Sequence, residues 1–243
     1  MVRKAIARKI ASGNKAFRLR GHEVKRIEAF SDAVFAFAVT LLIVSLEVPK
    51  SFEELVETMR GFFTFGICFT LLMLIWYEQN IFFRRYGIDD TLSIILNCIL
   101  IFLVLFFVYP LKFLFTAMFS SFIYGAGNSP FSMMPQDSSV LLLIYGSGYI
   151  LIYLLFSFMY LHALRKQEEL ELTTSEVYDT KTKLYSFYIL ISIGVLSVVL
   201  SQLLPENIAG SAGFAYILIG PAFSIFYSIR SGKKKIFFKI ADE

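Results

Sequence analysis

The sequence predicts an all-α polytopic membrane protein with six transmembrane helices and both termini in the cytoplasm. Of its 243 residues 57% are hydrophobic, against about 45–50% in a typical soluble domain. Mean hydropathy is +0.67. The apolar residues gather in long runs of about 20, the length that crosses a bilayer. Lys and Arg are concentrated in every second connection between these runs, as the positive-inside rule requires.

Each predicted span is an apolar run bounded by charged or turn-forming residues. The first run closes at Glu47 and Pro49, and the second closes at Arg84 and Arg85. The six runs are Ala29–Val48, Phe62–Phe83, Leu92–Pro110, Val140–Leu164, Leu184–Leu204 and Ala212–Ile229. The third stays apolar as far as Tyr124, which is too long for one straight crossing. We therefore expect a kink at Pro110 or an interfacial segment after it.

The basic residues orient this arrangement. Nine Lys and Arg residues precede or open the first span, while the connections on the opposite side hold only Lys50 and Arg60. Both termini are therefore predicted to be cytoplasmic. The chain divides into a basic N-terminal tail at 1–25, a six-helix transmembrane domain at 26–230 and a basic C-terminal tail at 231–243. The N-terminal tail fits either a helix on an anionic membrane surface or a solvated segment.

Cysteine and histidine usage argues against metal and cofactor chemistry. Cys68 and Cys98 lie inside apolar runs, where packing thiols are the ordinary interpretation. His22 and His162 are at the ends of different segments. No nucleophile–base set, metal cluster or phosphate-binding loop is visible in the sequence. We therefore expect no enzyme activity, no cofactor and no nucleic-acid partner.

The first span carries an acid, Asp32, one turn inside an apolar helix. An Asp at the bilayer centre costs about 2.5–3.5 kcal/mol, so even near the end a partner or a water-filled cavity is expected. The polar groups predicted at the same depth are Arg26 just before span one, Ser31 in span one, Trp76, Tyr77, Glu78, Gln79 and Asn80 in span two, and Ser93 and Asn97 in span three. Groups from three helices at one level can satisfy one another, so a structural staple is predicted.

Two faces of the first helix have distinct compositions. Large residues recur at alternating steps of four and three, at Phe30, Val34, Phe37, Leu41, Val44 and Val48. A period of 3.5 keeps one face against a common axis when several helices gather. The stripe Ala29, Ala33, Ala36 and Thr40 is small enough for close packing by a neighbouring helix. The large face either meets lipid or lines a conduction path, and the second option requires several copies of the chain.

The run Arg26-x-x-x-Phe30-Ser31-Asp32 resembles the signature of the lysosomal and prokaryotic potassium channels built from six-helix repeats. Trp76, Asn97 and Pro110 are similar to other recurrent positions of that family. The resemblance implies a prokaryotic member with a single repeat, assembled as a homotetramer among the lipids of the bacterial inner membrane. It also implies a potassium-permeable cation channel, with the potassium ion as the permeant species.

The resemblance implies that the first helix lines a central pore and that hydrophobic rings replace a carbonyl selectivity filter. By position, the constriction falls at Phe37, Leu41 and Val44, with Thr40 as the layer linked to selectivity. The network that joins the first helix to its neighbours would comprise Arg26, Phe30, Ser31, Asp32, Trp76, Asn80 and Asn97.

This sequence departs from the family pattern at two places. Phe37 stands where members usually have Ile or Leu, and Gln79 and Asn80 stand where members often carry histidines. The second departure removes a titratable partner for Asp32. The alternative function is a proton- or cation-coupled secondary transporter that uses Asp32 and Glu78 as its ionisable pair. The inverted repeats common in such transporters are not evident.

Overall fold

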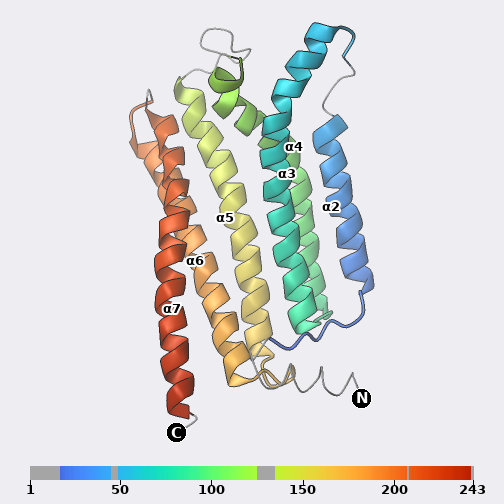
Figure 1. The fold of residues 1–243 in the computed structure, drawn as a ribbon, viewed down its shortest axis with the longest axis vertical. Coiled ribbons are helices and arrows are strands. Elements are labelled where there is room, and N and C mark those ends of the chain that lie inside the picture. Colours follow the sequence, from blue (N-terminus) through green and yellow to red (C-terminus); the bar gives the residue numbers. More distant parts are fainter. Residues whose placement is uncertain (1–16, 45–48, 125–134, 207, 242–243) are drawn as a thin grey trace.

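The computed structural model describes residues 17–44, 49–124, 135–206 and 208–241. Within these ranges the chain is helical with no strand, so the all-α prediction is confirmed (Figure 1). The elements are α2 (Arg26–Val44), α3 (Phe52–Tyr86), α4 (Thr91–Tyr124), α5 (Pro135–Arg165), α6 (Thr174–Leu203), the 3₁₀ helix η1 (Ala209–Leu218) and α7 (Ile219–Ala241).

Five segments of the described chain are long and apolar enough to cross a membrane. They are Phe52–Tyr86, Thr91–Val108, Asp137–Arg165, Thr174–Leu203 and Ala209–Lys234, the last formed by η1 and α7 together. Helix α2 adds 19 residues, and its three charges, Arg26, Glu28 and Asp32, all lie in its first two turns. Residues 45–48 of the predicted first span lie outside the described residues. The prediction of a multi-pass membrane protein is confirmed.

Helix boundaries extend beyond the apolar runs because polar turns cap them. Helix α3 starts ten residues before the predicted span, where the Ser51 side chain accepts a hydrogen bond from the Glu54 amide. It ends at Gly87, whose φ of 61° is the left-handed conformation that glycine adopts freely. Helix α4 is unbroken through Pro110, and α7 continues through residues expected to form a tail, as far as Ala241. Hydropathy alone does not register such polar extensions.

The helices form two groups joined through α4 and α5. Helices α2, α3 and α4 pack against one another, as do α5, α6 and η1, while α7 packs on α6 and η1. Helices α3, α5 and α7 end, and α2, α4 and α6 begin, at the same end of the bundle. We call it the basic end because Arg84, Arg85, Arg165, Lys166, Arg230, Lys233 and Lys234 lie there.

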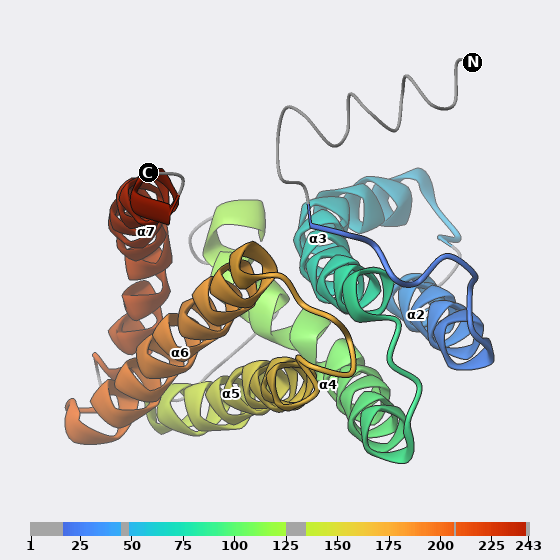
Figure 2. The same ribbon diagram turned by 90° about the horizontal axis from the view of Figure 1, so that it is seen from below.

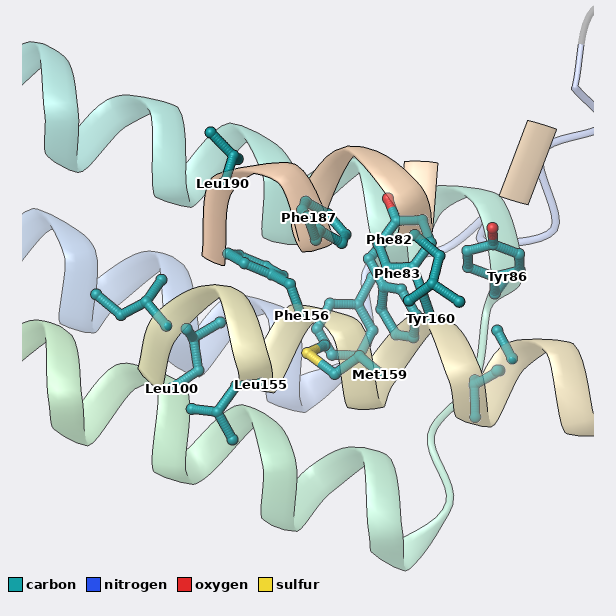
Figure 3. Packing of buried hydrophobic residues seen from close by; sticks show 14 residues of the cluster. Phe82, Phe83, Tyr86, Leu100, Leu155, Phe156, Met159, Tyr160, Phe187 and Leu190 are labelled. Atoms are coloured by element: carbon teal, nitrogen blue, oxygen red, sulfur yellow. The ribbon is translucent and has the colours of Figure 1, made fainter. Parts of the chain in front are cut away.

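The largest buried cluster lies toward the basic end and is dominated by aromatic rings (Figure 3). The Tyr160 ring centroid lies 5.3 Å from that of Phe82, 5.6 Å from that of Tyr86 and 5.2 Å from that of Phe187. Lipid is as apolar as these side chains, so helix association in a membrane relies on packing rather than on burial from water. Each such ring pair contributes about 0.5–1.5 kcal/mol beyond area burial.

The turn between α3 and α4 is pinned to the end of α5. One Asp90 oxygen accepts a hydrogen bond from the Ser93 amide at 3.1 Å, and the other lies 2.6 Å from His162 Nε2 and 3.2 Å from Lys166 Nζ. Burial by itself raises the pKa of Asp90. The Ser93 amide, His162 and Lys166 outweigh that effect and hold the pKa well below its usual value. Asp90 is therefore a fixed negative charge at the basic end.

Residues 17–25, which we call the N-terminal strap, cross the basic end from beside α3 to the start of α2 (Figure 2). The amides of Arg20 and Gly21 both donate to the Arg84 carbonyl at 3.1 Å. A Cβ on Gly21 would lie 2.6 Å from the Phe83 carbonyl oxygen, so this close approach requires glycine.

An ion pair fastens the strap to the start of α6. Arg20 Nη2 lies 2.8 Å from Glu176 Oε2, and these side chains are only 11% and 5% exposed. Arg20 also donates to the Leu170 and Glu171 carbonyls. The tail expected at 1–25 is therefore part of the folded bundle from Phe17 onward, and its first 16 residues lie outside the described residues.

Candidate pore-lining face and its polar network

Helix α2 buries one narrow side against α3 and α4. Its buried residues are spaced by alternating steps of three and four: Glu28, Ser31, Phe35, Ala38 and Leu42. At 3.6 residues per turn these five positions fall within about 80° of the helix circumference. This side packs on Cys68, Leu72, Ile101 and Val104 of α3 and α4.

Most of the remaining circumference of α2 is uncovered in the single chain. After Arg26, which is exposed at the start of the helix, the exposed residues are Ala29, Phe30, Asp32, Ala33, Ala36, Phe37, Thr40 and Ile43, which we call the open face of α2. It spans about 160° of the helix. Phe30 and Phe37 are each 56% exposed, a large uncovered area for aromatic side chains. The open face therefore combines the small-residue stripe with Phe30 and Phe37, two residues of the large face of the helix.

The predicted constriction residues do not share one environment. Phe37 and Thr40 belong to the open face, whereas Leu41 is half-buried and packs against the cluster between α2, α3 and α4. The Val44 side chain lies outside the described part of the structure. Of the four residues, Phe37 and Thr40 are the two that are exposed in the single chain.

The Thr40 hydroxyl has a defined orientation. It donates a hydrogen bond to the Phe37 carbonyl of its own helix, with Oγ1 at 2.7 Å from the oxygen. The proton is therefore committed to the backbone, and the oxygen lone pairs remain as acceptors. An exposed hydroxyl held in this way presents partial negative charge, the polarity that a cation prefers.

A buried hydrogen-bond chain links α2, α4 and α3. Asn97 Nδ2 donates to Ser31 Oγ at 2.7 Å, and Ser31 in turn donates to the Ile27 carbonyl at 2.8 Å. Gln79 Nε2 donates to Asn97 Oδ1 at 2.8 Å. Ser31, Gln79 and Asn97 are at most 2% exposed. In an apolar surrounding these groups have only each other to bond, so the chain fixes the rotation of α2 about its axis.

Asp32 has its partner on α3. Trp76 Nε1 donates to Asp32 Oδ1 at 2.7 Å, near the exposed edge of the α2–α3 contact. The acid thus lies at the periphery of the open face rather than in its centre. This second link acts one residue along from Ser31, so two consecutive α2 residues are tied to two different helices.

Three residues of the sequence-based network do not enter these links. The side chains of Arg26 and Asn80 make no hydrogen bond or ion pair with any described residue, and Phe30 points outward as part of the open face. Gln79 occupies the place predicted for Asn80. The helical register explains why Gln79 faces inward, because Gln79 lies seven residues after buried Leu72 and seven before buried Tyr86, on the inner stripe of α3.

Glu78 is engaged away from Asp32. It accepts a hydrogen bond from the Tyr160 hydroxyl at 2.9 Å, and its other oxygen lies 2.6 Å from Lys183 Nζ. These partners belong to α5 and α6, whereas Asp32 contacts Trp76. The two acids therefore do not form the ionisable pair that the transporter alternative requires.

Comparison with known proteins identifies the family that shares this architecture. The family model for the endosomal/lysosomal potassium channel TMEM175 matches residues 26–110. A potassium channel of Marivirga tractuosa is 40% identical over 233 residues, which cover 91% of this chain and 94% of the relative. The chain belongs to the TMEM175 family. A potassium channel of Chamaesiphon minutus is 32% identical over 98 residues, 36% of this chain and 47% of that protein.

Solved structures of TMEM175 channels share the fold. A threonine-to-alanine variant of the potassium channel MtTMEM175, crystallised with a nanobody–MBP fusion protein, superposes with a TM-score of 0.79 at 37% identity. The match covers 90% of this chain and 99% of that one. A lysosomal potassium-selective channel TMEM175 homologue from Chamaesiphon minutus matches with a TM-score of 0.50 at 21% identity, over 85% and 96% of the two chains, which shows the fold alone.

The part of the chain that matches the TMEM175 family model contains both links of the polar network. Residues 26–110 comprise α2, α3 and the part of α4 before Leu111. They hold the Ser31–Asn97–Gln79 chain and the Asp32–Trp76 bond. The N-terminal strap and helices α5 to α7 lie outside that match. The family model is therefore centred on the helix with the open face and on the two helices that orient it.

Proposed function

We propose that the chain is the subunit of a potassium-permeable cation channel, a homotetramer in the bacterial inner membrane with a central pore lined by α2. The open face of α2 carries the proposal. A membrane helix with a narrow buried side and a wide uncovered one needs further partners, and identical copies around an axis would supply them. The naming of relatives as potassium channels supports the permeant ion.

In this assembly the open face serves two contacts. The small residues Ala33 and Ala36 allow a neighbouring α2 to approach closely. The edge that holds Phe37 then turns toward the axis, where four phenyl rings narrow the path. Ions cross such a hydrophobic constriction only when it is wetted, so small changes in its radius open and close it.

Thr40 lies one turn further along α2 and provides the polar layer. Its oxygen lone pairs replace part of the water shell of an ion that leaves the hydrated vestibule. The buried Ser31–Asn97–Gln79 chain and the Asp32–Trp76 bond hold α2 at the rotation that presents Phe37 and Thr40. We assign Asp32 a positioning role and not a place on the ion path.

The basic end is assigned to the cytoplasm. Its cluster of Lys and Arg residues supports this assignment through the positive-inside rule, and we infer that both termini lie on that side.

Flux through proteoliposomes tests the proposal. The purified protein should conduct potassium faster than sodium, and Phe37→Ala should increase the total cation flux and lower the potassium-to-sodium ratio, because the narrowest ring is removed. Phe102→Ala is the matched control. Phe102 is 63% exposed on α4, so this variant removes an equally accessible ring without touching α2. Absence of cation flux from the wild type, or equal effects of the two variants, would overturn the assignment.

A further inference from the structure

A polar pocket opens at the basic end between α3, α6 and α7, away from the open face of α2. Its volume is about 360 Å³. Four basic side chains line it: Arg85 of α3, Lys183 of α6, and Arg230 and Lys234 of α7. Figure 2 shows this end of the bundle, with the start of α6 between α3 and α7.

Two of these four charges are already neutralised. Lys183 Nζ lies 2.6 Å from Glu78 Oε2, and Lys234 Nζ lies 2.7 Å from Asp179 Oδ2. Arg85 and Arg230 have no carboxylate partner among the described residues. The pocket therefore has an excess of two positive charges on guanidinium groups, which suit the bidentate recognition of phosphate.

Aromatic rings hold both guanidiniums in place. The Arg230 guanidinium carbon lies 4.4 Å from the centre of the Tyr178 ring, and Arg230 Nε donates to Thr182 Oγ1 at 3.1 Å. The Arg85 guanidinium carbon lies 5.0 Å from the Phe17 ring of the N-terminal strap. Because the rings fix their positions, little side-chain entropy is lost when an anion binds.

A second pocket of about 360 Å³ lies deeper in the bundle, between α3, α4, α5 and η1. Its lining is mostly aliphatic and aromatic, and it includes Leu74 and Ile75 of α3. Leu74 lies on the same side of α3 as Ile81 and Arg85 of the basic pocket, seven and eleven residues before them. At 1.5 Å per residue, Leu74 is about 10 Å from Ile81 and about 16 Å from Arg85 along the helix. The charged pocket therefore lies near the membrane surface and the apolar pocket lies deeper. This arrangement matches an amphiphile with an anionic head.

We propose that the basic pocket binds the phosphate of an anionic phospholipid from the leaflet at the basic end, with an acyl chain directed toward the apolar pocket. Basic pockets between transmembrane helices recognise such headgroups through charge and hydrogen bonds. The lipid would join α3 to α7, two helices whose described residues do not pack against each other directly. The proposal requires only that the chain spans a membrane, and it is independent of the ion that the channel conducts.

Native mass spectrometry of the detergent-solubilised protein tests this binding, with phosphatidylglycerol and phosphatidylcholine as probes. We expect the wild type to retain phosphatidylglycerol in preference to phosphatidylcholine. Arg85→Gln together with Arg230→Gln should weaken phosphatidylglycerol binding about 30-fold, and Arg85→Gln alone about fivefold. The single variant keeps the experiment decisive if loss of the Arg230–Tyr178 contact disturbs α7.

The matched control is Arg84→Gln together with Lys233→Gln. Both side chains are exposed neighbours of the pocket residues on the same two helices, so the control removes the same charge from the same end. It should change the affinity less than threefold. Equal retention of the two lipids, or equal losses in control and pocket variants, would overturn the proposal. Displacement of phosphatidylglycerol by millimolar glycerol 3-phosphate would identify a site for soluble phosphates instead, which also overturns it.

Discussion

The ion pair between Arg20 and Glu176 is the most buried ion pair described for the N-terminal strap, and its removal gives a testable prediction. Replacing Arg20 by Met keeps an unbranched apolar side chain that reaches as far as Nε, and deletes the charge and the donors of the guanidinium. Glu176, only 5% exposed, then loses the guanidinium that lies 2.8 Å from its carboxylate. Removing one partner of a buried ion pair leaves the other charge without compensation.

The expected cost follows from what Glu176 retains. Losing one member of a buried pair typically costs about 3–5 kcal/mol. Here the carboxylate keeps hydrogen bonds from the Arg18 and Thr173 amides, at 2.7 and 2.9 Å. We therefore take the lower limit, about 3 kcal/mol, which corresponds to roughly a 150-fold shift toward the undocked strap.

Hydrogen exchange at the Arg20 and Gly21 amides measures this equilibrium, because both amides bond to Arg84 only while the strap is docked. Exchange at the two amides, one of them carried by Met in the variant, should accelerate about 150-fold. Arg18→Met is the control. Its ion pair with Glu171 spans 3.7 Å between side chains that are 67% and 80% exposed, so its loss should change exchange less than about fivefold. Similar rates in the two variants would refute the reasoning.

Two further predictions concern α2 and its support. Asn97→Leu removes the hydrogen bonds to Ser31 and Gln79, which are worth about 0.6 kcal/mol each in a membrane protein, and should lower the free energy of unfolding in dodecyl sulfate by about 1 kcal/mol. Asn80→Leu, which removes no such bond, should leave it unchanged, and equal losses would contradict the network. Thr40→Val should lower the potassium-to-sodium flux ratio several-fold while Thr40→Ser retains it. An unchanged ratio in the valine variant would show that the hydroxyl does not face the ion.

Much of the fold was predictable because membrane spans carry a strong composition signal. The apolar runs located the long helices, and basic residues such as Arg84 and Arg85 marked their ends. The polar extensions were not predictable in the same way, since the start of α3 depends on a cap at Ser51 outside the apolar run. The strap was missed for a related reason. A basic segment is interpreted as solvated unless its acidic partner is known. The partner of Arg20 is Glu176, which lies about 150 residues away in the sequence.

The candidate site was predictable in its chemistry more than in its orientation. Polar groups of three helices were expected at one depth, and Ser31 and Asn97 are bonded there. The choice between Gln79 and Asn80 depended on which residue of α3 faces inward, and that is decided by packing across helices. The rotation of α2 about its axis could not be predicted either. Leu41 and Thr40 are adjacent in sequence, and only the contacts with α3 and α4 show that Leu41 is half-buried while Thr40 is exposed.

The strap also sets the limits within which the chain can be shortened or fused. Cutting before Phe17 removes none of the contacts described for residues 17–25, so a tag placed there leaves the Arg20–Glu176 pair and the Gly21 crossing intact. Cutting at Arg26, where the apolar core begins, removes all of them and leaves the carboxylate of Glu176 without its guanidinium. The domain boundary predicted at residue 26 is therefore nine residues too late for a stable protein.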